Sequence, residues 1–346
     1  MKDFTPLTNA LEAMTGVLFP GANLRIYDRG IPVLSQTFGY ADEEIERPTA
    51  PDEIYAGYSV TKLLTCACAL KAAEQGRIRL TDPLSEYLPE FSHMQVLHAE
   101  PSGRYTAPAG SPIRLEHLLS MSAGFGDGPA YPADTRESVK KLSERPLLFE
   151  PGTRWAYGLC HDVLGTVLET VYQKKLRHIF RDLFFEPLGM KSSRFLSEVK
   201  DVSVLTPQYE ADKNGYRRRP LDRTYAPHPD YDSGGAGLVT TADDYAVFLD
   251  ALACGRILKP ETLALMTADR LTGQMRRDFC WPQCRGYGYG LGVRTGEKDW
   301  GWGGAAGAYT LVDKASKASL CFFTQVLNAD EVKLYGEIRD RYFECR

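Results

Sequence analysis

The sequence has no long uninterrupted hydrophobic run and no strong excess of charge of either sign. No stretch approaches the roughly 18 apolar residues that a transmembrane helix requires, so we expect no membrane span. The 41 Lys and Arg residues are nearly balanced by 45 Asp and Glu residues, giving a net charge of −4. Because no basic patch or charged tail stands out, neither nucleic acid nor an anionic membrane is expected as a partner.

The cysteines lack the spacing of a metal site. Several of the eight lie within apolar segments, as Cys66 and Cys68 do, which is typical of buried free thiols. Cys280 and Cys284 are four residues apart, but no second Cys/His pair accompanies them at zinc spacing. We therefore expect free thiols in a reducing cytoplasm, no metal and no cofactor.

The first residues also lack the apolar core of a secretory signal, which agrees with a cytoplasmic location. Instead Leu7, Leu11, Met14 and Leu18 recur at helical spacing and predict an amphipathic first helix. The overall composition, with 43% hydrophobic and 25% charged residues, is that of an ordinary globular protein, and we find no internal repeat.

Both ends of the chain are predicted to form strands, and the middle to form helices. Alternating apolar runs separated by turn residues predict strands at 23–27, 31–38, 288–293, 308–312 and 318–323. After residue 330, one face of a closing helix is predicted to carry Val332, Tyr335, Ile338 and Tyr342.

Helical signals fill the middle of the sequence. Asp82-Pro83 is typical of a helix start and predicts a helix over 84–88. Further helices are predicted over 115–119, from Asp162 onward, and after Thr241.

We therefore expect a two-lobed α/β fold, in which an antiparallel sheet is flanked by the N- and C-terminal helices and a mostly helical lobe is inserted. Residues 1–60 and 285–346 are predicted to form the sheet lobe, and residues 61–284 the helical lobe. The site is expected in the cleft between them.

The segment around Ser59 carries the strongest chemical signal. A helix that begins at Ser59 places Lys62 one turn later on the same face. The positive end of the helix dipole would stabilise negative charge on the serine oxygen, and a nearby lysine can accept its proton. A Ser-x-x-Lys sequence is also common by chance, and its ordinary interpretation is a capping serine followed by a solvated lysine.

Further motifs accompany Ser-x-x-Lys in a fixed order along nearly the whole chain. They lie at residues 58–62, 80–84, 113–119, 151–153, 234–244 and 302–304. On these motifs the sequence resembles the serine β-lactamase and penicillin-binding-protein superfamily. Within it, the sequence is most similar to the class C-like branch that contains the family VIII carboxylesterases. The resemblance implies the β-lactamase/transpeptidase-like fold.

The resemblance also implies roles for particular residues. Ser59 matches the acylated nucleophile, Lys62 its partner in proton transfer, and Tyr157 the tyrosine of the family's Tyr-x-Asn element. The implied oxyanion hole consists of the backbone N–H groups of Ser59 and Ala305. Small residues at Gly303 and Gly304 would let a substrate lie close to the backbone.

Two positions depart from the family pattern and bear on the substrate. Leu159 stands where the family has the asparagine that binds an acylamino side chain. Trp302-Gly303-Gly304 replaces Lys-Thr-Gly, so the cation that holds a substrate carboxylate is missing and Trp302 offers an apolar surface. Both changes favour an uncharged ester over an anionic lactam.

Other kinds of site have less support. The sequence has no Gly-x-Ser-x-Gly elbow of an α/β-hydrolase, and the glycines at 301–307 are not followed by the Lys-Ser/Thr of a phosphate-binding loop. The histidines show no metal-ligand spacing; His117 is expected in the core and His161 on a helix surface.

The leading hypothesis is a serine hydrolase that forms an acyl-enzyme on a small neutral ester, with amides as a further substrate class. Two alternatives stay open: β-lactamase or DD-peptidase activity, and a binding or sensor protein that acylates slowly without turnover. The expected partner is a small-molecule substrate, and the sequence leaves the oligomeric state undefined.

Overall fold

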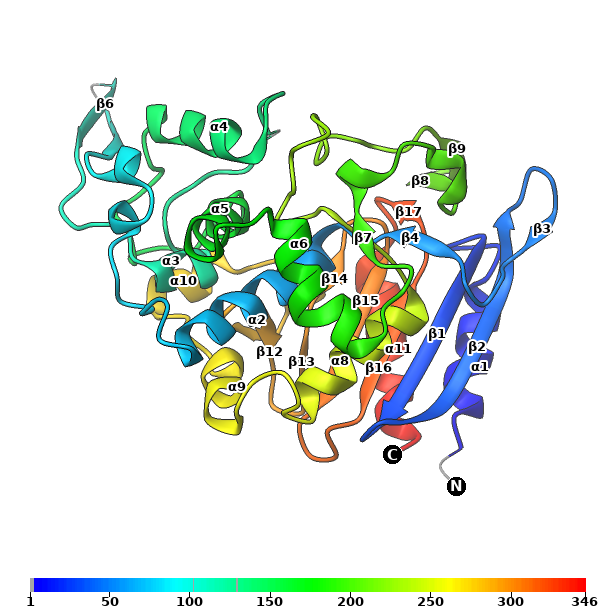
Figure 1. The fold of residues 1–346 in the computed structure, drawn as a ribbon. Helices are drawn as coiled ribbons and strands as arrows, with labels where there is room; N and C mark the ends of the chain where they lie inside the picture. Colours follow the sequence, from blue (N-terminus) through cyan, green and yellow to red (C-terminus); the bar gives the residue numbers. More distant parts are fainter. Residues whose placement is uncertain (1–2, 102, 129) are drawn as a thin grey trace.

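Both ends of the chain form one antiparallel sheet in the computed structural model, which describes residues 3–101, 103–128 and 130–346 (Figure 1). Its strands follow the order β11 (Gly288–Tyr289), β12 (Arg294–Thr295), β13 (Asp299–Gly301), β15 (Ala308–Asp313), β16 (Ser319–Phe323), β1 (Gly21–Asp28), β2 (Ile31–Asp42) and β3 (Arg47–Pro48). A further strand, β14 (Gly303–Gly304), also pairs with β15. The predicted sheet from both termini is confirmed.

The conformation of the hairpin between β1 and β2 explains why its turn could be predicted from the sequence. Arg29 and Gly30 have φ values of 52° and 86°. Two consecutive positive φ values define the tight turn whose twist matches that of the flanking antiparallel strands. The glycine adopts this conformation without steric cost, and the two strands pair on either side of it.

Helices cover both faces of this sheet, because its side chains are apolar on both sides. On β16, Leu320 and Phe322 pack in one core cluster with residues of α1 (Thr5–Met14) and α11 (Glu331–Glu344). Phe323, which points to the opposite face, contacts Tyr245 of α8 (Ala242–Ala253) with ring centroids 5.4 Å apart. The Thr241 side chain caps α8 by accepting from the Asp244 N–H at 3.1 Å.

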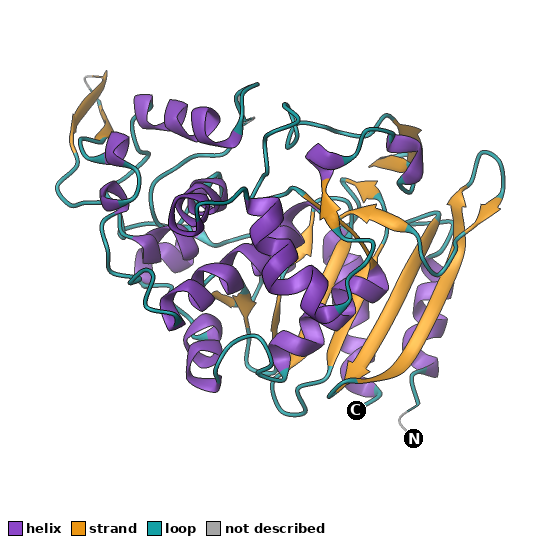
Figure 2. Ribbon diagram, viewed as in Figure 1, coloured by secondary structure: helices purple, strands orange, loops and turns teal. Residues whose placement is uncertain are grey.

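The remaining helices lie mainly beside the sheet, toward the left in Figure 2. They are α2 (Thr61–Glu74), α3 (Leu115–Leu119), α4 (Thr135–Lys140), α5 (Cys160–Tyr172), α6 (Leu176–Phe180), α7 (Glu186–Leu188), α9 (Pro260–Thr267) and α10 (Gly273–Asp278). A π-helical turn spans Arg181–Phe185, and 3₁₀ turns span Tyr58–Val60, Leu84–Glu86, Pro89–Phe91, Lys141–Glu144, Leu196–Glu198, Val202–Val204 and Pro282–Cys284.

Small sheets complete the fold. They are β4 (Ile54–Ala56) with β10 (Leu238–Thr241) and β7 (Arg194–Phe195); β17 (Val326–Leu327) with β8 (Gln208–Asp212) and β9 (Gly215–Arg219); and β5 (Gln95–Glu100) with β6 (Gly103–Pro108). Because α8 lies against the main sheet, the predicted helical segment also covers one of the sheet's faces. The exact lobe boundaries, 1–60 with 285–346 and 61–284, stay a prediction.

The strand predicted over 288–293 is wrong beyond Tyr289. Gly290–Val293 instead form a tight turn, in which the Gly290 N–H donates to the Val293 carbonyl at 2.8 Å. Gly292 has a φ of +81°, and a Cβ on it would lie 2.4 Å from the Cys66 sulfur. The apolar alternation here therefore reflects close packing against α2 and not a continuing strand.

Three smaller predictions also need correction. The helix predicted over 84–88 is only a 3₁₀ turn, because the Asp82 carboxylate accepts from the Arg79 N–H and the Tyr87 hydroxyl instead of capping a helix. On α11, Leu334 is buried and Val332 is 52% exposed. Leu18 lies beyond the end of α1. No helix of the described residues is long and apolar enough to cross a membrane.

Candidate active site

Ser59 lies on a short 3₁₀ turn, η1 (Tyr58–Val60), that runs directly into α2. Tyr58 has a φ of 47°, a left-handed conformation that costs free energy in a non-glycine residue and is concentrated at functional sites. Its buried hydroxyl donates to the Gln208 side chain, which fixes the turn. Residues 61–70 of α2 are all buried, so Lys62 is only 3% exposed.

The structure brings together the three residues predicted to carry the chemistry. The Tyr157 hydroxyl donates to Ser59 Oγ at 2.6 Å, and Lys62 Nζ donates to the same oxygen at 3.2 Å. Lys62 Nζ also donates to the Gly235 carbonyl at 2.7 Å and lies 4.5 Å from the centre of the Tyr157 ring. Two side chains that can take part in proton transfer with Ser59 therefore lie within hydrogen-bond reach of its Oγ.

Ser59 opens into a cavity of about 280 Å³. Its lining includes Ser59, Tyr157, Trp302, Gly303, Gly304 and Ala305, all of which were predicted from the sequence. Leu159 is different: it is 4% exposed, packs within the hydrophobic core and is not among the residues that line this cavity. Its predicted contact with substrate therefore has no support from the cavity.

Trp302 forms part of an aromatic wall of this cavity. Its ring stacks on Tyr157 with centroids 5.9 Å apart and lies 6.1 Å from the ring of Trp281. Thr310 fixes its backbone, because the threonine hydroxyl accepts from the Trp302 N–H and donates to the Trp302 carbonyl. The wall is therefore rigid as well as apolar.

The glycine that follows in this strand is required by close packing. A Cβ on Gly304 would lie 2.4 Å from the Gly57 carbonyl oxygen. Only glycine lets the strand approach the turn that carries Ser59 this closely. The contact places the backbone of residues 303–305 beside the serine.

A buried carboxylate near Lys62 is the main feature that the sequence analysis missed. Asp162, 2% exposed, accepts from the Tyr231 hydroxyl at 2.9 Å and from the Ser233 hydroxyl at 2.7 Å. Burial raises the pKa of Asp162, while the Ser233 hydrogen bond and the charge of Lys62 lower it. A Cβ on Gly235 would lie 2.6 Å from Asp162 Oδ2 and 3.5 Å from Lys62 Nζ, so both charged groups crowd this glycine.

The sequence analysis assigns Asp162 only as the start of a predicted helix. The signal that could have found it is an acidic residue at the first turn of a helix whose neighbouring positions are otherwise apolar. Its partners at 231–235 come from a distant part of the chain, so the sequence alone does not indicate them.

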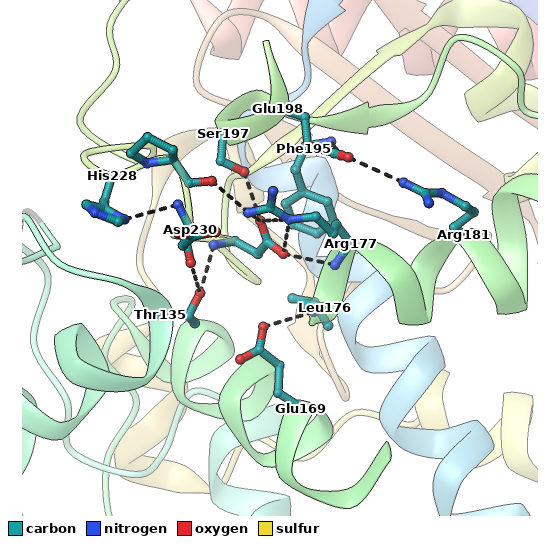
Figure 3. A network of polar contacts seen from close by, with 12 residues as sticks. Thr135, Glu169, Leu176, Arg177, Arg181, Phe195, Ser197, Glu198, His228 and Asp230 are labelled. Carbon is teal, nitrogen blue, oxygen red and sulfur yellow. Dashed lines mark hydrogen bonds and ion pairs between the residues drawn. The ribbon is translucent and has the colours of Figure 1, made fainter. Parts of the chain in front are cut away.

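A polar network fixes the segment that carries these partners (Figure 3). Arg177 on α6 donates through Nε to the fully buried Asp232 carboxylate at 2.8 Å. From the other side, Thr135 donates to the Asp230 carbonyl at 3.1 Å and accepts from the Asp232 N–H at 2.8 Å. The network holds Tyr231 and Ser233 where their hydroxyls reach Asp162.

His161 does not lie on a helix surface as predicted. It is fully buried, with Nε2 3.3 Å from the Cys66 sulfur. Burial, with a smaller contribution from the Lys62 charge, lowers the pKa of His161 to about 3. The imidazole is therefore neutral and acts as a core residue beneath the site.

No group of three or more His, Cys, Asp or Glu side chains within the described part of the chain could hold a metal ion. The site that the structure offers is thus built from Ser59, Lys62, Tyr157 and backbone groups.

Comparison with known proteins identifies the family of the chain. The sequence matches the family described as Beta-lactamase over residues 10–342. The chain belongs to the beta-lactamase family. It is a serine hydrolase that works through an acyl-enzyme, and the predicted resemblance and fold are confirmed.

Relatives within the beta-lactamase family include Esterase EstB from Burkholderia gladioli, which is 28% identical over 83% of this chain and 81% of EstB. Among solved structures, EstCE1, a hydrolase with promiscuous acyltransferase activity, has a TM-score of 0.84 at 24% identity and covers 98% of this chain and 99% of its own. A mutant of simvastatin synthase from Aspergillus terreus has a TM-score of 0.82 at 21% identity, covering 98% and 96%. These two structures establish the shared fold.

The proximity of Lys62 and Asp162 predicts an energetic coupling between them. Removing either charge leaves the other buried without its counter-charge, so Lys62→Met and Asp162→Asn should each destabilise the protein. The free energy of unfolding lost by the double variant should be about 0.5–3 kcal/mol smaller than the sum of the two single losses, as measured by chemical denaturation.

Lys71→Met on the same helix provides the control, because Lys71 pairs with Glu74 near the surface. Its effect should add to that of Asp162→Asn within about 0.5 kcal/mol. If the losses in free energy of unfolding are additive for both pairs of substitutions, Asp162 does not stabilise the Lys62 charge.

Proposed function

We propose that this protein hydrolyses small neutral esters, with Ser59 as the nucleophile and Tyr157 and Lys62 as its proton-transfer partners. The observation that carries the proposal is the contact of both partner side chains with Ser59 Oγ, at 2.6 Å and 3.2 Å. The names of relatives agree with it, since EstB is called an esterase and EstCE1 a hydrolase.

In the proposed acylation, Ser59 Oγ forms a bond to the ester carbonyl carbon and its proton passes to Tyr157 in the tyrosinate form. The Lys62 ammonium stabilises that tyrosinate through its position over the ring and beside the serine. The Ser59 and Ala305 N–H groups are proposed to bind the oxyanion. As the bond to the alcohol breaks, Tyr157 returns the proton to the leaving oxygen.

Deacylation reverses these roles. A water molecule gives a proton to Tyr157 and attacks the acyl carbon, and Ser59 Oγ leaves with the proton from Tyr157. Atoms and protons balance over the cycle, and the enzyme returns to its starting state.

The preference for neutral esters follows from Trp302. An indole in place of the family's lysine gives apolar contact and no charge-assisted bond to a carboxylate. A β-lactam or a peptide with a free carboxylate therefore loses an interaction that a neutral ester does not need.

We also propose a cytoplasmic, reducing location. Of the eight cysteines, none of which is disulfide-bonded, five are buried, and burial raises the pKa of Cys160 to about 12 and of Cys284 to about 11. Neutral buried thiols of this kind are inert, and they are typical of proteins kept reduced.

The nucleophile can be tested with a chromogenic short-chain ester and a fluorophosphonate probe. Ser59→Ala should lose esterase activity by about 10³-fold or more and lose labelling while staying folded. Unchanged turnover in the variant would reject Ser59. Labelling of the wild type without turnover would instead indicate a sensor, and efficient nitrocefin hydrolysis a β-lactamase.

The proton-transfer partners predict a non-additive pair of effects. Lys62→Met and Tyr157→Phe should each slow acylation by about 10²–10⁴-fold, because each removes one part of the same proton path. Their double variant should lose far less than the product of the two factors. Tyr172→Phe, which removes a hydroxyl outside the cavity, is the control and should retain activity; multiplicative losses would mean that the two groups act independently.

The role of Trp302 can be tested with one substrate in two forms, with its carboxylate free and methyl-esterified. The wild type should prefer the methyl ester, and Trp302→Lys should shift the kcat/KM ratio toward the free carboxylate by about ten- to a hundredfold. Trp302→Met removes the ring without adding charge and should not produce that shift. A wild-type preference for the free carboxylate would contradict the neutral-ester proposal.

The cysteines give a direct test of the compartment proposal. In the native protein a thiol reagent should label the exposed Cys280 first, then Cys254 and Cys345, and leave the five buried thiols unmodified until unfolding. Intact-mass measurement on protein from its natural source should show eight free thiols. A disulfide between Cys280 and Cys284 would contradict a reducing location.

A further inference from the structure

One acidic side chain in the cavity has no place in the proposed ester chemistry. Among the residues that line the cavity, Glu331 is the sole carboxylate, and no ion pair joins it to another described residue. It lies in the first turn of α11. The Gln283 side chain donates to Glu331 Oε2 at 2.9 Å, and the nearby Tyr335 hydroxyl, which donates to the Ala308 carbonyl at 3.1 Å, also lowers the pKa of this carboxyl.

These contacts place Glu331 beside the strand that forms the substrate wall. The Tyr335 hydroxyl lies 3.1 Å from the position that a Cβ on Gly303 would occupy. The same hydroxyl donates to the Gly304 carbonyl at 3.4 Å, so Tyr335 connects the surroundings of Glu331 to the backbone that follows Trp302. A substrate that lies along residues 302–304 brings its far end toward this carboxyl.

The positive charge that borders the same cavity is buried against aromatic rings. Arg294 is 3% exposed, donates to the Thr310 carbonyl at 3.0 Å and lies against the rings of Tyr287 and Tyr309. The charges of Tyr309 and of the buried Asp299 favour the charged form of Arg294 and raise its pKa. The remaining ionisable neighbour, Cys284, is a neutral thiol because burial raises its pKa to about 11. Glu331 is thus the sole carboxylate that lines the cavity, and in its ionised form it has no ion-pair partner among the described residues.

The aromatic wall indicates which part of the substrate meets this charge. Tyr157, which returns the proton to the leaving oxygen, packs on Trp281 with centroids 4.8 Å apart and on Trp302 at 5.9 Å. The wall that starts at Tyr157 therefore continues along the leaving alcohol. Indole rings attract alkylammonium groups, and a nearby carboxylate strengthens that attraction.

We propose that the cavity binds esters of amino alcohols, with the ammonium group of the alcohol against Glu331 and the indoles of Trp281 and Trp302. This substrate class rests on the proposed ester hydrolysis and revises its charge preference: among esters without a carboxylate, those with a cationic leaving group are preferred over neutral ones. A positively charged leaving group can form an ion pair with the Glu331 carboxylate, whereas a neutral alcohol leaves that carboxylate without a counter-charge.

Two acetate esters of the same shape test this proposal. Acetylcholine carries a trimethylammonium group, and 3,3-dimethylbutyl acetate carries an uncharged tert-butyl group in its place. The wild type should have the higher kcat/KM for the cationic ester. Glu331→Gln keeps the side-chain size but removes the charge, and it should lower the ratio of the two kcat/KM values by about ten- to a hundredfold.

The pH dependence supplies a second readout. Burial raises the pKa of Glu331 to about 7, and only the ionised carboxylate attracts the cation. The cationic-to-neutral ratio should therefore rise between about pH 6 and pH 8 in the wild type and stay flat in Glu331→Gln. Because the ratio compares two substrates on one enzyme, titration of Ser59's proton-transfer partners affects both esters and largely cancels.

Glu337→Gln is the matched control, since Glu337 lies on the same helix and pairs with Arg341 outside the cavity. It should leave both kcat/KM values and the pH profile of their ratio unchanged. If the neutral ester is the better substrate and Glu331→Gln does not change the ratio, the amino-alcohol proposal is wrong while ester hydrolysis stands. If neither ester is hydrolysed and Ser59 is not acylated, ester hydrolysis itself fails.

Discussion

The site depends on a positive charge held away from water. Lys62 is 3% exposed, and an isolated ammonium in such a place would be strongly destabilising. The structure offsets this cost with the Gly235 carbonyl, the Ser59 hydroxyl, the face of the Tyr157 ring and the nearby negative charge of Asp162. These groups come from three separate parts of the chain, around residue 59, at 157–162 and at 235, so Lys62 can be buried only when the whole fold is assembled around it.

The same requirement explains why the turn before α2 is fixed so firmly. The Gly57 N–H donates to the Leu238 carbonyl at 2.8 Å, and the Thr61 hydroxyl accepts from the Leu238 N–H at 3.0 Å. The Tyr245 hydroxyl donates to the Val60 carbonyl at 2.9 Å. Strand β10 and helix α8 thus hold the strained turn on both sides of Ser59. A hydroxyl fixed in this way keeps its short contacts with both proton-transfer partners, which favours fast transfer.

Sequence reasoning succeeded where a short segment determines its own conformation. The Arg29-Gly30 turn, the Thr241 cap and the one-turn separation of Ser59 from Lys62 depend on neighbouring residues only. The motif resemblance supplied Tyr157, which lies 98 residues further along the chain. Sequence reasoning failed where packing against a distant part of the chain decides the local conformation or burial. Examples are Gly292, which packs against Cys66, and His161, whose burial depends on α2. Leu159 was assigned by position in a motif, and its side chain turns into the core.

Tyr157 contacts both Lys62 and the aromatic wall of the cavity. Lys62 lies over its ring at 4.5 Å, while Trp281 and Trp302 pack around the same ring on the cavity side. The lysine charge therefore acts at close range on Ser59 and Tyr157, and Glu331 has its own hydrogen-bond partner, Gln283, elsewhere in the cavity lining. Because proton transfer and recognition of the leaving group use different side chains, substitutions in the aromatic wall or at position 331 can change the substrate without disturbing Ser59, Lys62 and Tyr157. Such a division of labour gives a physical reason why one family fold can serve substrates of different charge.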